Sequence, residues 1–129
     1  MQLRQPRHAF LAIAEVVMNE RLKQPIRQVI EHLVAGKYAE LETLTKGQRL
    51  TAQEMAKTVS DYGRTLVLPP DDAFRLMDVV EVQNAQPPQW SITMPLWTHE
   101  EGRSDLSIGV TLIADVEDFR IELDDIHVL

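Results

Sequence analysis

The residues best suited to chemistry stand near the end of the printed sequence, in the run Asp124-Asp125-Ile126-His127. Side chains two residues apart on a strand point to the same face, so Asp125 and His127 would lie together there. A carboxylate beside an imidazole can fix its tautomer and make it a general base. No nucleophile or oxyanion donor accompanies them, so the catalytic set is incomplete. Asp125 and His127 are therefore candidate catalytic residues, with a structural role or an interaction surface as the alternatives.

A second group of residues suits recognition of another molecule. Strict alternation along a strand places Trp97 on the face opposite Trp90. A tryptophan close to Glu100 and Glu101 is typical of a protein-binding hot spot, unless a helix or strand covers it. The predicted binding surface consists of Trp97, Glu100, Glu101, Asp105, Asp124 and Asp125.

Metal and cofactor sites are not expected. The chain has no cysteine, which excludes thiolate ligands and a cysteine nucleophile. Its five glycines are scattered and form no phosphate-binding loop. His99 neighbours Glu100 and Glu101, but no helical or strand spacing fixes these side chains as ligands, and a solvated turn is the simpler interpretation.

The charge is unevenly distributed along the 129 residues. Residues 1–64 hold ten Lys and Arg against seven Asp and Glu, whereas residues 65–129 hold three against thirteen. A half with a net charge of −10 is unsuited to a phosphate backbone, which requires clustered bases. The acidic half therefore predicts a basic protein partner or self-association, and no nucleic acid. The alternative is an acidic surface that only maintains solubility.

The first half of the chain is helical in pattern. Pro6 suits a helix start, and an apolar face made by Phe10, Ile13, Ala14 and Val17 follows it. A second helix is expected to begin at Pro25, with a stripe of Ile26, Val29, Ile30, Leu33 and Val34. A short helix should precede Gly47. Thr51 and Glu54 have the spacing of a capping box, and Gly63 should end the helix that they begin.

The second half alternates with the period of strands. Strands are expected at residues 78–82, 90–96, 106–112 and 119–128. Pro95 has no N–H, which predicts a sheet edge or a bulge there. Ile121 and Leu123 are apolar at odd positions, whereas Ile126 and Val128 are apolar at even positions. This change of register predicts a β-bulge or bend at residues 124–125, or burial of both faces.

Together these patterns predict a single α+β domain over residues 1–129. The helical half covers about residues 6–63 and the sheet half about 65–129, with the helices packed on one face of an antiparallel sheet of three to five strands. No run reaches the ~18 apolar residues of a membrane span, and the N-terminus lacks a signal-peptide pattern. A soluble, cytoplasmic protein is the expectation.

Several strings resemble those of a known family. They are PLWT at residues 95–98, EEGRSDL at 100–106, DDIHVL at 124–129, GKYAEL at 36–41 and YGRTL at 62–66. The resemblance is to a family of small bacterial proteins defined as a domain of unknown function. It covers most of the chain beyond about residue 25 and implies no activity.

The order of elements is similar to cystatin-like and nuclear-transport-factor-2-like domains. These domains curve a sheet around helices and often enclose a pocket, and some are isomerases or hydratases. Here the facing residues are apolar, which indicates a filled core. They are Ile26, Ile30, Leu33, Tyr38, Ile108, Val110, Ile121 and Leu123.

Three functional hypotheses follow. The first is a non-enzymatic protein-interaction module, in its sharpest form an immunity- or antitoxin-like protein that masks a basic toxin or nuclease. The second is a small-molecule-binding protein or acid–base enzyme of the curved-sheet class that uses Asp125 and His127. The third is a dimeric scaffold that pairs through Trp97 and the sheet face.

Overall fold

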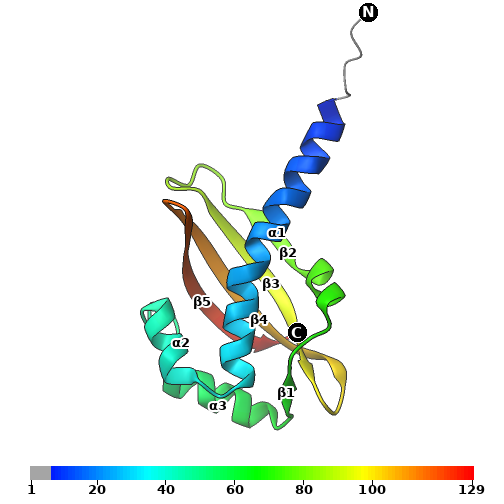
Figure 1. Cartoon of the computed structure of the whole chain (residues 1–129). Helices are drawn as coiled ribbons and strands as arrows, with labels where there is room; N and C mark the ends of the chain where they lie inside the picture. Colours follow the sequence, from blue (N-terminus) through cyan, green and yellow to red (C-terminus); the bar gives the residue numbers. More distant parts are fainter. Residues whose placement is uncertain (1–6) are drawn as a thin grey trace, which may run out of the picture.

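The computed structural model describes residues 7–129, with side chains from residue 16 onward. Three helices precede a five-stranded antiparallel sheet, which confirms the predicted α+β class (Figure 1). The elements are α1 (Arg7–Val34), α2 (Tyr38–Thr45), α3 (Ala52–Tyr62), β1 (Leu66–Val67), the 3-10 helix η1 (Asp71–Leu76), β2 (Asp78–Glu81), β3 (Gln89–Thr98), β4 (Gly102–Asp115) and β5 (Asp118–Val128). No helix among the described residues has both the length and the apolar character to cross a membrane.

Helix α1 is one continuous helix of 28 residues, so the predicted separate start at Pro25 is wrong. Proline inside a helix removes one hydrogen bond and disturbs the preceding turn. Here the ring of Pro25 is buried, and Leu22 and Ile26 on either side are fully buried. Packing of this face against the sheet therefore outweighs the lost hydrogen bond. In the predicted first stripe, Phe10, Ile13 and Ala14 lie outside the described side chains, and Val17 is 56% exposed.

The start and end of α3 are as predicted. The hydroxyl of Thr51 accepts a hydrogen bond from the N–H of Glu54 at 3.2 Å, and the Glu54 carboxylate accepts from the N–H of Thr51 at 3.1 Å. Gly63 follows the helix with a φ of +75°, a conformation that glycine adopts without strain. These contacts set where the helical half ends and the sheet begins.

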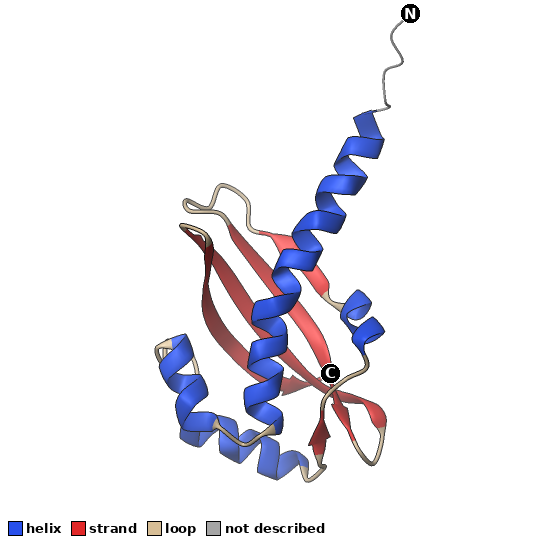
Figure 2. Ribbon diagram, in the orientation of Figure 1, coloured by secondary structure: helices blue, strands red, loops and turns tan. Residues whose placement is uncertain are grey.

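The strands follow one another as a meander from β2 to β5 (Figure 2). β3 pairs with β4 on one side, and its other side is shared by β2 and β1. Pro95 lies between the two shared stretches, because β2 begins opposite Thr93 and β1 pairs with β3 from Trp97 onward. The missing N–H of Pro95 therefore faces a gap in the pairing, and the register between β3 and β4 also shifts between Pro95 and Trp97. Both features agree with the prediction made for this proline.

The core lies between α1 and one face of the sheet (Figure 1). The alternation of each long strand places one set of side chains against the helix. The facing residues predicted to fill this space are nearly all buried, with Ile26, Ile30, Leu33, Ile108, Val110, Ile121 and Leu123 at most 5% exposed and Tyr38 packed at their margin. The space between helix and sheet is therefore a filled core.

The predicted bulge in the last strand is present at Asp124. Asp125 pairs with Gly109 and Leu123 pairs with Val110, so Asp124 is the extra residue of β5. The insertion changes the parity of the strand, and both Leu123 and Ile126 are consequently buried. It also turns Asp125 and His127 to the face of the sheet away from α1, because their neighbour Ile126 points into the core.

Candidate functional site on the last strand

The structure brings the two candidate catalytic residues into contact. The Nδ1 atom of His127 lies 2.7 Å from the Oδ1 atom of Asp125. Asp125 lies opposite Gly109 on β4, and a Cβ atom at position 109 would lie only 2.7 Å from that Oδ1. Gly109 therefore leaves the space in which the carboxylate reaches the imidazole. The arrangement can hold His127 in one tautomer with its Nε2 free to accept or donate a proton.

Ser107 joins this pair across the strands. It lies opposite His127, so serine, histidine and aspartate side chains meet on one face of the sheet. However, Ser107 is 0% exposed, and its hydroxyl has no hydrogen-bond partner among the described residues. A nucleophile needs both access to substrate and contact with its base, and Ser107 has neither. Sequence analysis missed Ser107, because its position opposite His127 depends on the register across the bulge.

Asp124, the bulge residue of β5, lies next to this pair in the sequence. The hydroxyl of Thr111 donates to its Oδ2 atom at 2.6 Å, and its Oδ1 atom is buried without a hydrogen bond from any described residue. The Nε atom of Arg49 approaches that oxygen at 3.7 Å, an ion pair too long for a hydrogen bond. Burial raises the pKa of Asp124, and the Thr111 hydrogen bond and Arg49 only partly oppose this rise.

Glu100 belongs to the turn between β3 and β4, where it connects two distant segments. Its carboxylate accepts hydrogen bonds from the backbone N–H of Thr65 at 2.8 Å and from the Thr65 hydroxyl at 2.9 Å. The Thr65 N–H is the main reason why the pKa of Glu100 lies below its usual value, and its own N–H and the Thr65 hydroxyl add to the effect. Glu100 thus ties the turn to the segment between α3 and β1.

Glu101 makes a similar connection. It accepts hydrogen bonds from the Tyr62 hydroxyl at 2.9 Å and from the Thr98 hydroxyl at 3.2 Å, and Arg64 lies 3.8 Å away. Burial raises the pKa of Tyr62, and its hydrogen bond to Glu101 adds to the rise. The carboxylates of Glu100 and Glu101 are therefore already engaged within the chain.

The predicted binding surface divides into two places. Trp97, Glu100 and Glu101 gather at the β3–β4 turn, where Trp97 pairs with Val67, is half-buried and packs against the core. Less of its ring is free than alternation alone suggests, because β1, a strand that the sequence did not predict, pairs with β3 at this point. The other three acids, Asp105, Asp124 and Asp125, lie on β4 and β5, and the carbonyl of Asp105 accepts from the N–H of Leu129 at 2.9 Å.

A groove of about 370 Å³ lies between α3 and the end of β5. Thr58, Asp61 and Tyr62 of α3 line one side, and Leu106, Ile126, His127 and Val128 line the other. Asp61 forms an ion pair with Lys57 at 2.6 Å on the outer surface of the helix. His127 is one of the lining residues, so the groove adjoins the Asp125–His127 pair.

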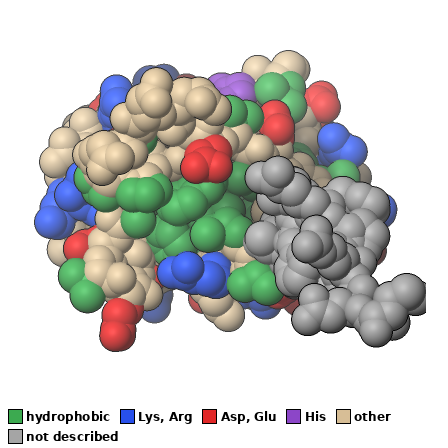
Figure 3. Space-filling view, turned by 90° about the horizontal axis from the view of Figure 1, so that it is seen from above, with side chains coloured by type: hydrophobic (Ala, Val, Ile, Leu, Met, Phe, Trp, Pro, Cys, Tyr) green, Lys and Arg blue, Asp and Glu red, His purple; other side chains and the backbone are tan. Residues whose placement is uncertain are grey.

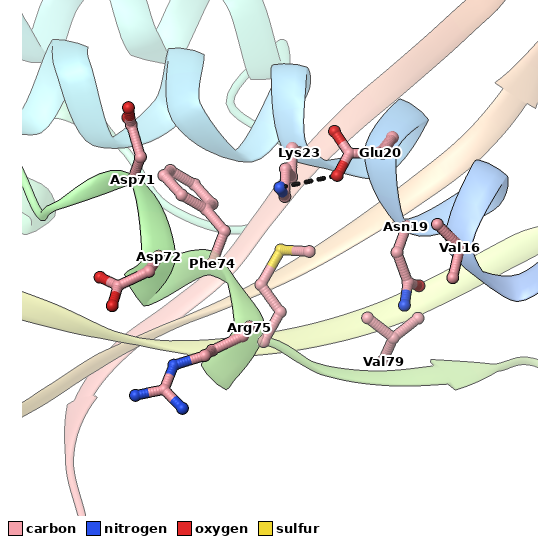
Figure 4. A pocket seen from close by; sticks show the side chains of 10 residues that line it. Val16, Asn19, Glu20, Lys23, Asp71, Asp72, Phe74, Arg75 and Val79 are labelled. Carbon is pink, nitrogen blue, oxygen red and sulfur yellow. Dashed lines mark hydrogen bonds and ion pairs between the residues drawn. The ribbon is translucent and has the colours of Figure 1, made fainter.

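Another hollow, of about 300 Å³, lies between α1, η1 and β2 (Figure 4). Its apolar floor contains Phe74 and Val79, and Lys23 on its rim is paired with Glu20 at 2.9 Å. None of the predicted site residues lines it. Within the described part of the chain, no three His, Asp or Glu side chains are grouped as a metal site.

Apolar side chains are also exposed near the projecting end of α1. Val16 and Val17 are 62% and 56% exposed. Seen from that end, hydrophobic side chains gather in the middle of the surface, with single charged side chains around them (Figure 3). Nothing in the described residues identifies what would cover this surface, so it supports no functional assignment.

A family model described as a domain of unknown function, DUF7668, matches residues 30–129. The chain belongs to this family. The matched region contains α2, α3 and all five strands, and agrees with the predicted resemblance beyond about residue 25. No curated protein and no solved structure matches the chain. The candidate site lies within the matched region, and the family description assigns no activity to it.

Proposed function

We propose that the chain is a protein-interaction module that binds a basic partner through the acidic half of its sheet. The observation that carries this proposal is the hairpin of β4 and β5. Residues 115–125 contain six carboxylates and one basic residue, Arg120. Among the described side chains, only Asp124 and Asp125 of these six have a basic residue within ion-pair distance, Arg49 and His127 respectively. A strip of unneutralised carboxylates attracts and orients a basic surface.

The centre of this surface is the β5 side of the sheet rather than the β3–β4 turn. Asp105 and Asp125 are exposed there, and Glu122 adds a half-buried carboxylate. Glu100 and Glu101 contribute less, because hydrogen bonds within the chain already use their oxygens. Trp97 contributes only the part of its ring that the core leaves free.

The finer form of the proposal is a bacterial, cytoplasmic protein of the immunity or antitoxin type. Such a protein inhibits a basic toxin or nuclease by covering the surface that contacts the toxin's own target. Its requirements are an acidic face that matches the toxin and rapid association through long-range attraction. The net charge of −10 over residues 65–129 supports both requirements.

The experiment compares three tagged proteins in a pull-down from the native lysate at low salt. They are the wild type, the double variant Glu117→Lys/Glu122→Lys, and the matched control Glu31→Lys/Glu40→Lys, which makes the same charge change on the helices. We expect a stoichiometric partner rich in Lys and Arg, eluted by salt, with the wild type and the control but not with the Glu117→Lys/Glu122→Lys variant. Absence of such a partner, or equal recovery with both variants, contradicts the proposal.

A second candidate function is acid–base catalysis on a small molecule, as in the curved-sheet enzymes. The 2.7 Å contact between Asp125 and His127 next to a 370 Å³ groove favours it. The test is a panel of isomerase, hydratase and esterase substrates with the wild type and His127→Asn. Turnover that the folded variant loses supports catalysis, and turnover that both proteins share excludes a role for His127.

A further inference from the structure

The end of β5 presents unused main-chain hydrogen-bonding groups. β5 pairs with β4 and with no other described strand, which makes it an edge of the sheet. In an antiparallel ladder, successive residues direct their N–H and C=O groups alternately toward the partner and away from it. The N–H of Leu129 donates to the carbonyl of Asp105 on β4, and His127 and Asp125, two and four residues earlier, direct their main-chain groups toward β4 in the same way. Ile126 and Val128 therefore direct their N–H and C=O groups away from β4.

These groups lie beside the groove between β5 and α3. Within the described part of the chain, no loop, turn or side-chain hydrogen bond uses the main-chain groups of Ile126 or Val128. Val128 is 61% exposed, and the side chains of Thr58 and Tyr62 line the facing side of the groove. An open strand edge next to a helix is a geometry in which extended peptides bind by adding a strand.

The remainder of β5 is protected against such pairing. Bulges and charged side chains are the usual means by which proteins block an exposed edge. The bulge is at Asp124, and the preceding part of β5 carries Asp118, Arg120 and Glu122. The segment of residues 126–128 has neither a bulge nor a carboxylate. The open edge is thus confined to the stretch that lines the groove.

We infer that this open edge, Ile126–Val128, binds an extended basic segment of a partner protein as an added antiparallel strand. The inference rests on the proposed function and specifies where and how the partner binds. Residues of the added strand opposite Ile126 and Val128 lie on the groove side and are apolar. The residues between them lie on the same face as Asp125 and His127, and are Lys or Arg. The partner segment therefore alternates apolar and basic residues with a period of two.

The charge of β5 favours such a partner over a second copy of the chain. Within Asp118–Val128 there are four carboxylates and one arginine. Pairing of β5 with its own copy would bring two acidic strands together, and like charges across strands destabilise a sheet. A strand with alternate lysines places opposite charges across the new ladder instead.

The first test uses synthetic peptides with blocked ends and the full chain. The probe alternates Lys and Val over seven residues. One control peptide has the same composition, with its Lys residues in one block and its Val residues in another. The other control alternates Glu and Val. We expect the Lys–Val peptide to bind at least about tenfold more tightly than either control. N-methylation of the Val amides should weaken it by about tenfold, whereas N-methylation of the Lys amides should change little, because only alternate amides face β5.

The second test changes the edge itself. Val128→Pro removes the N–H that faces the open edge and leaves the bonds between β4 and β5 in place. Val128→Thr keeps this N–H and the branched shape. We expect about a tenfold loss of peptide affinity for the proline variant and less than about a twofold change for the threonine variant. If the proline variant is unfolded, amide exchange in the wild type decides instead: the Ile126 and Val128 amides should be protected only when peptide is bound, and the His127 amide in both states.

The outcomes separate this inference from the proposed function. Suppose that the Lys–Val peptide binds, that both N-methylated forms bind as tightly, and that Val128→Pro does not weaken binding. The edge inference is then wrong, and a basic partner remains supported. If no lysine-bearing peptide binds and the pull-down gives no basic partner, both are wrong. If the free protein sediments as a dimer with its Ile126 and Val128 amides already protected, the edge binds a second copy, and the inference is overturned.

Discussion

Two pairs of adjacent acids in the sheet half have opposite environments. Glu100 and Glu101 at the β3–β4 turn accept hydrogen bonds from Thr65, Tyr62 and Thr98, and the pKa of Glu100 is lowered. At the β5 bulge, Asp124 has a raised pKa and one oxygen that receives no hydrogen bond from the described residues, and the hydrogen-bond partner of the Asp125 carboxylate is His127. The first pair stabilises the chain that carries it, whereas in the second pair the exposed Asp125 is left for other interactions. Whether an acidic residue is available thus depends on its neighbours in space.

Removal of Glu101 should have the largest effect on stability. Glu101→Ala leaves the Tyr62 hydroxyl and the buried Thr98 hydroxyl without their acceptor. Loss of such hydrogen bonds should lower the free energy of unfolding by about 1–3 kcal/mol, measured by urea denaturation. Asp105→Ala, which removes an exposed carboxylate, is the control and should change it by less than about 0.5 kcal/mol. Equal losses in both variants would show that the turn is no more important than the open surface.

Glu100→Gln should destabilise the protein only where the carboxyl group is ionised. The pKa of Glu100 lies below its ordinary value of 4.5 in the folded chain, so its contribution is present above that value and disappears as the pH falls through the lowered pKa. Thermal unfolding at neutral pH should give a lower midpoint for the variant than for the wild type. The difference should close in acid, and a constant difference over the whole range would contradict the assignment.

Asp124→Asn should show the reverse dependence on pH. Because burial raises the pKa of Asp124 above 3.8, the folded state binds its proton more tightly, and wild-type stability falls as the pH rises through the raised pKa. The variant lacks this decrease and should be more stable at neutral pH by less than about 1 kcal/mol, because the carboxyl keeps part of its hydration. Urea denaturation of both proteins between pH 3 and 7 measures the difference. A variant that is less stable at neutral pH would show that the Thr111 hydrogen bond outweighs the burial.

The bulge shows how much of the site the sequence could predict. The switch of apolar residues from odd to even positions is a local pattern, and it located Asp124 and the shared face of Asp125 and His127 correctly. The capping box at Thr51 and the filled core were predictable for the same reason. The local signal at Pro25, by contrast, wrongly predicted a new helix there, because tertiary packing keeps α1 continuous.

The partners of the acids were not predictable. Thr65 and Glu100 are 35 residues apart, and Tyr62 and Glu101 are 39 apart. Their contacts depend on the two-residue strand β1, which is too short to have a recognisable alternation. The position of Ser107 opposite His127 likewise depends on the register across two strands. Sequence patterns thus identified the elements, whereas cross-strand register decided which side chains are engaged.

A smaller effect is expected at Asp125, and on binding rather than on folding. Asp125→Asn removes a charge from the face where the basic residues of the added strand would lie, and keeps the shape of the side chain. The affinity for the Lys–Val peptide should fall about threefold, measured by calorimetry at low salt, and the loss should shrink as salt is added. Glu101→Gln is the matched control at the turn and should leave the affinity unchanged. An equal loss from both variants would mean that the two acidic pairs are equivalent for binding.

The smallest effect is expected at Lys57 on α3, which pairs with the groove residue Asp61. Lys57 and Asp61 form an ion pair with side chains 74% and 64% exposed, and such pairs contribute about 0.3–0.5 kcal/mol. Lys57→Ala should therefore reduce stability only slightly, while it leaves Asp61 without its cation. Because Asp61 lines the groove, the affinity for the Lys–Val peptide should then rise about twofold, and the affinity for the Glu–Val control should not. A fall in affinity would show that the peptide does not lie along α3, and it would move the binding surface away from the end of β5.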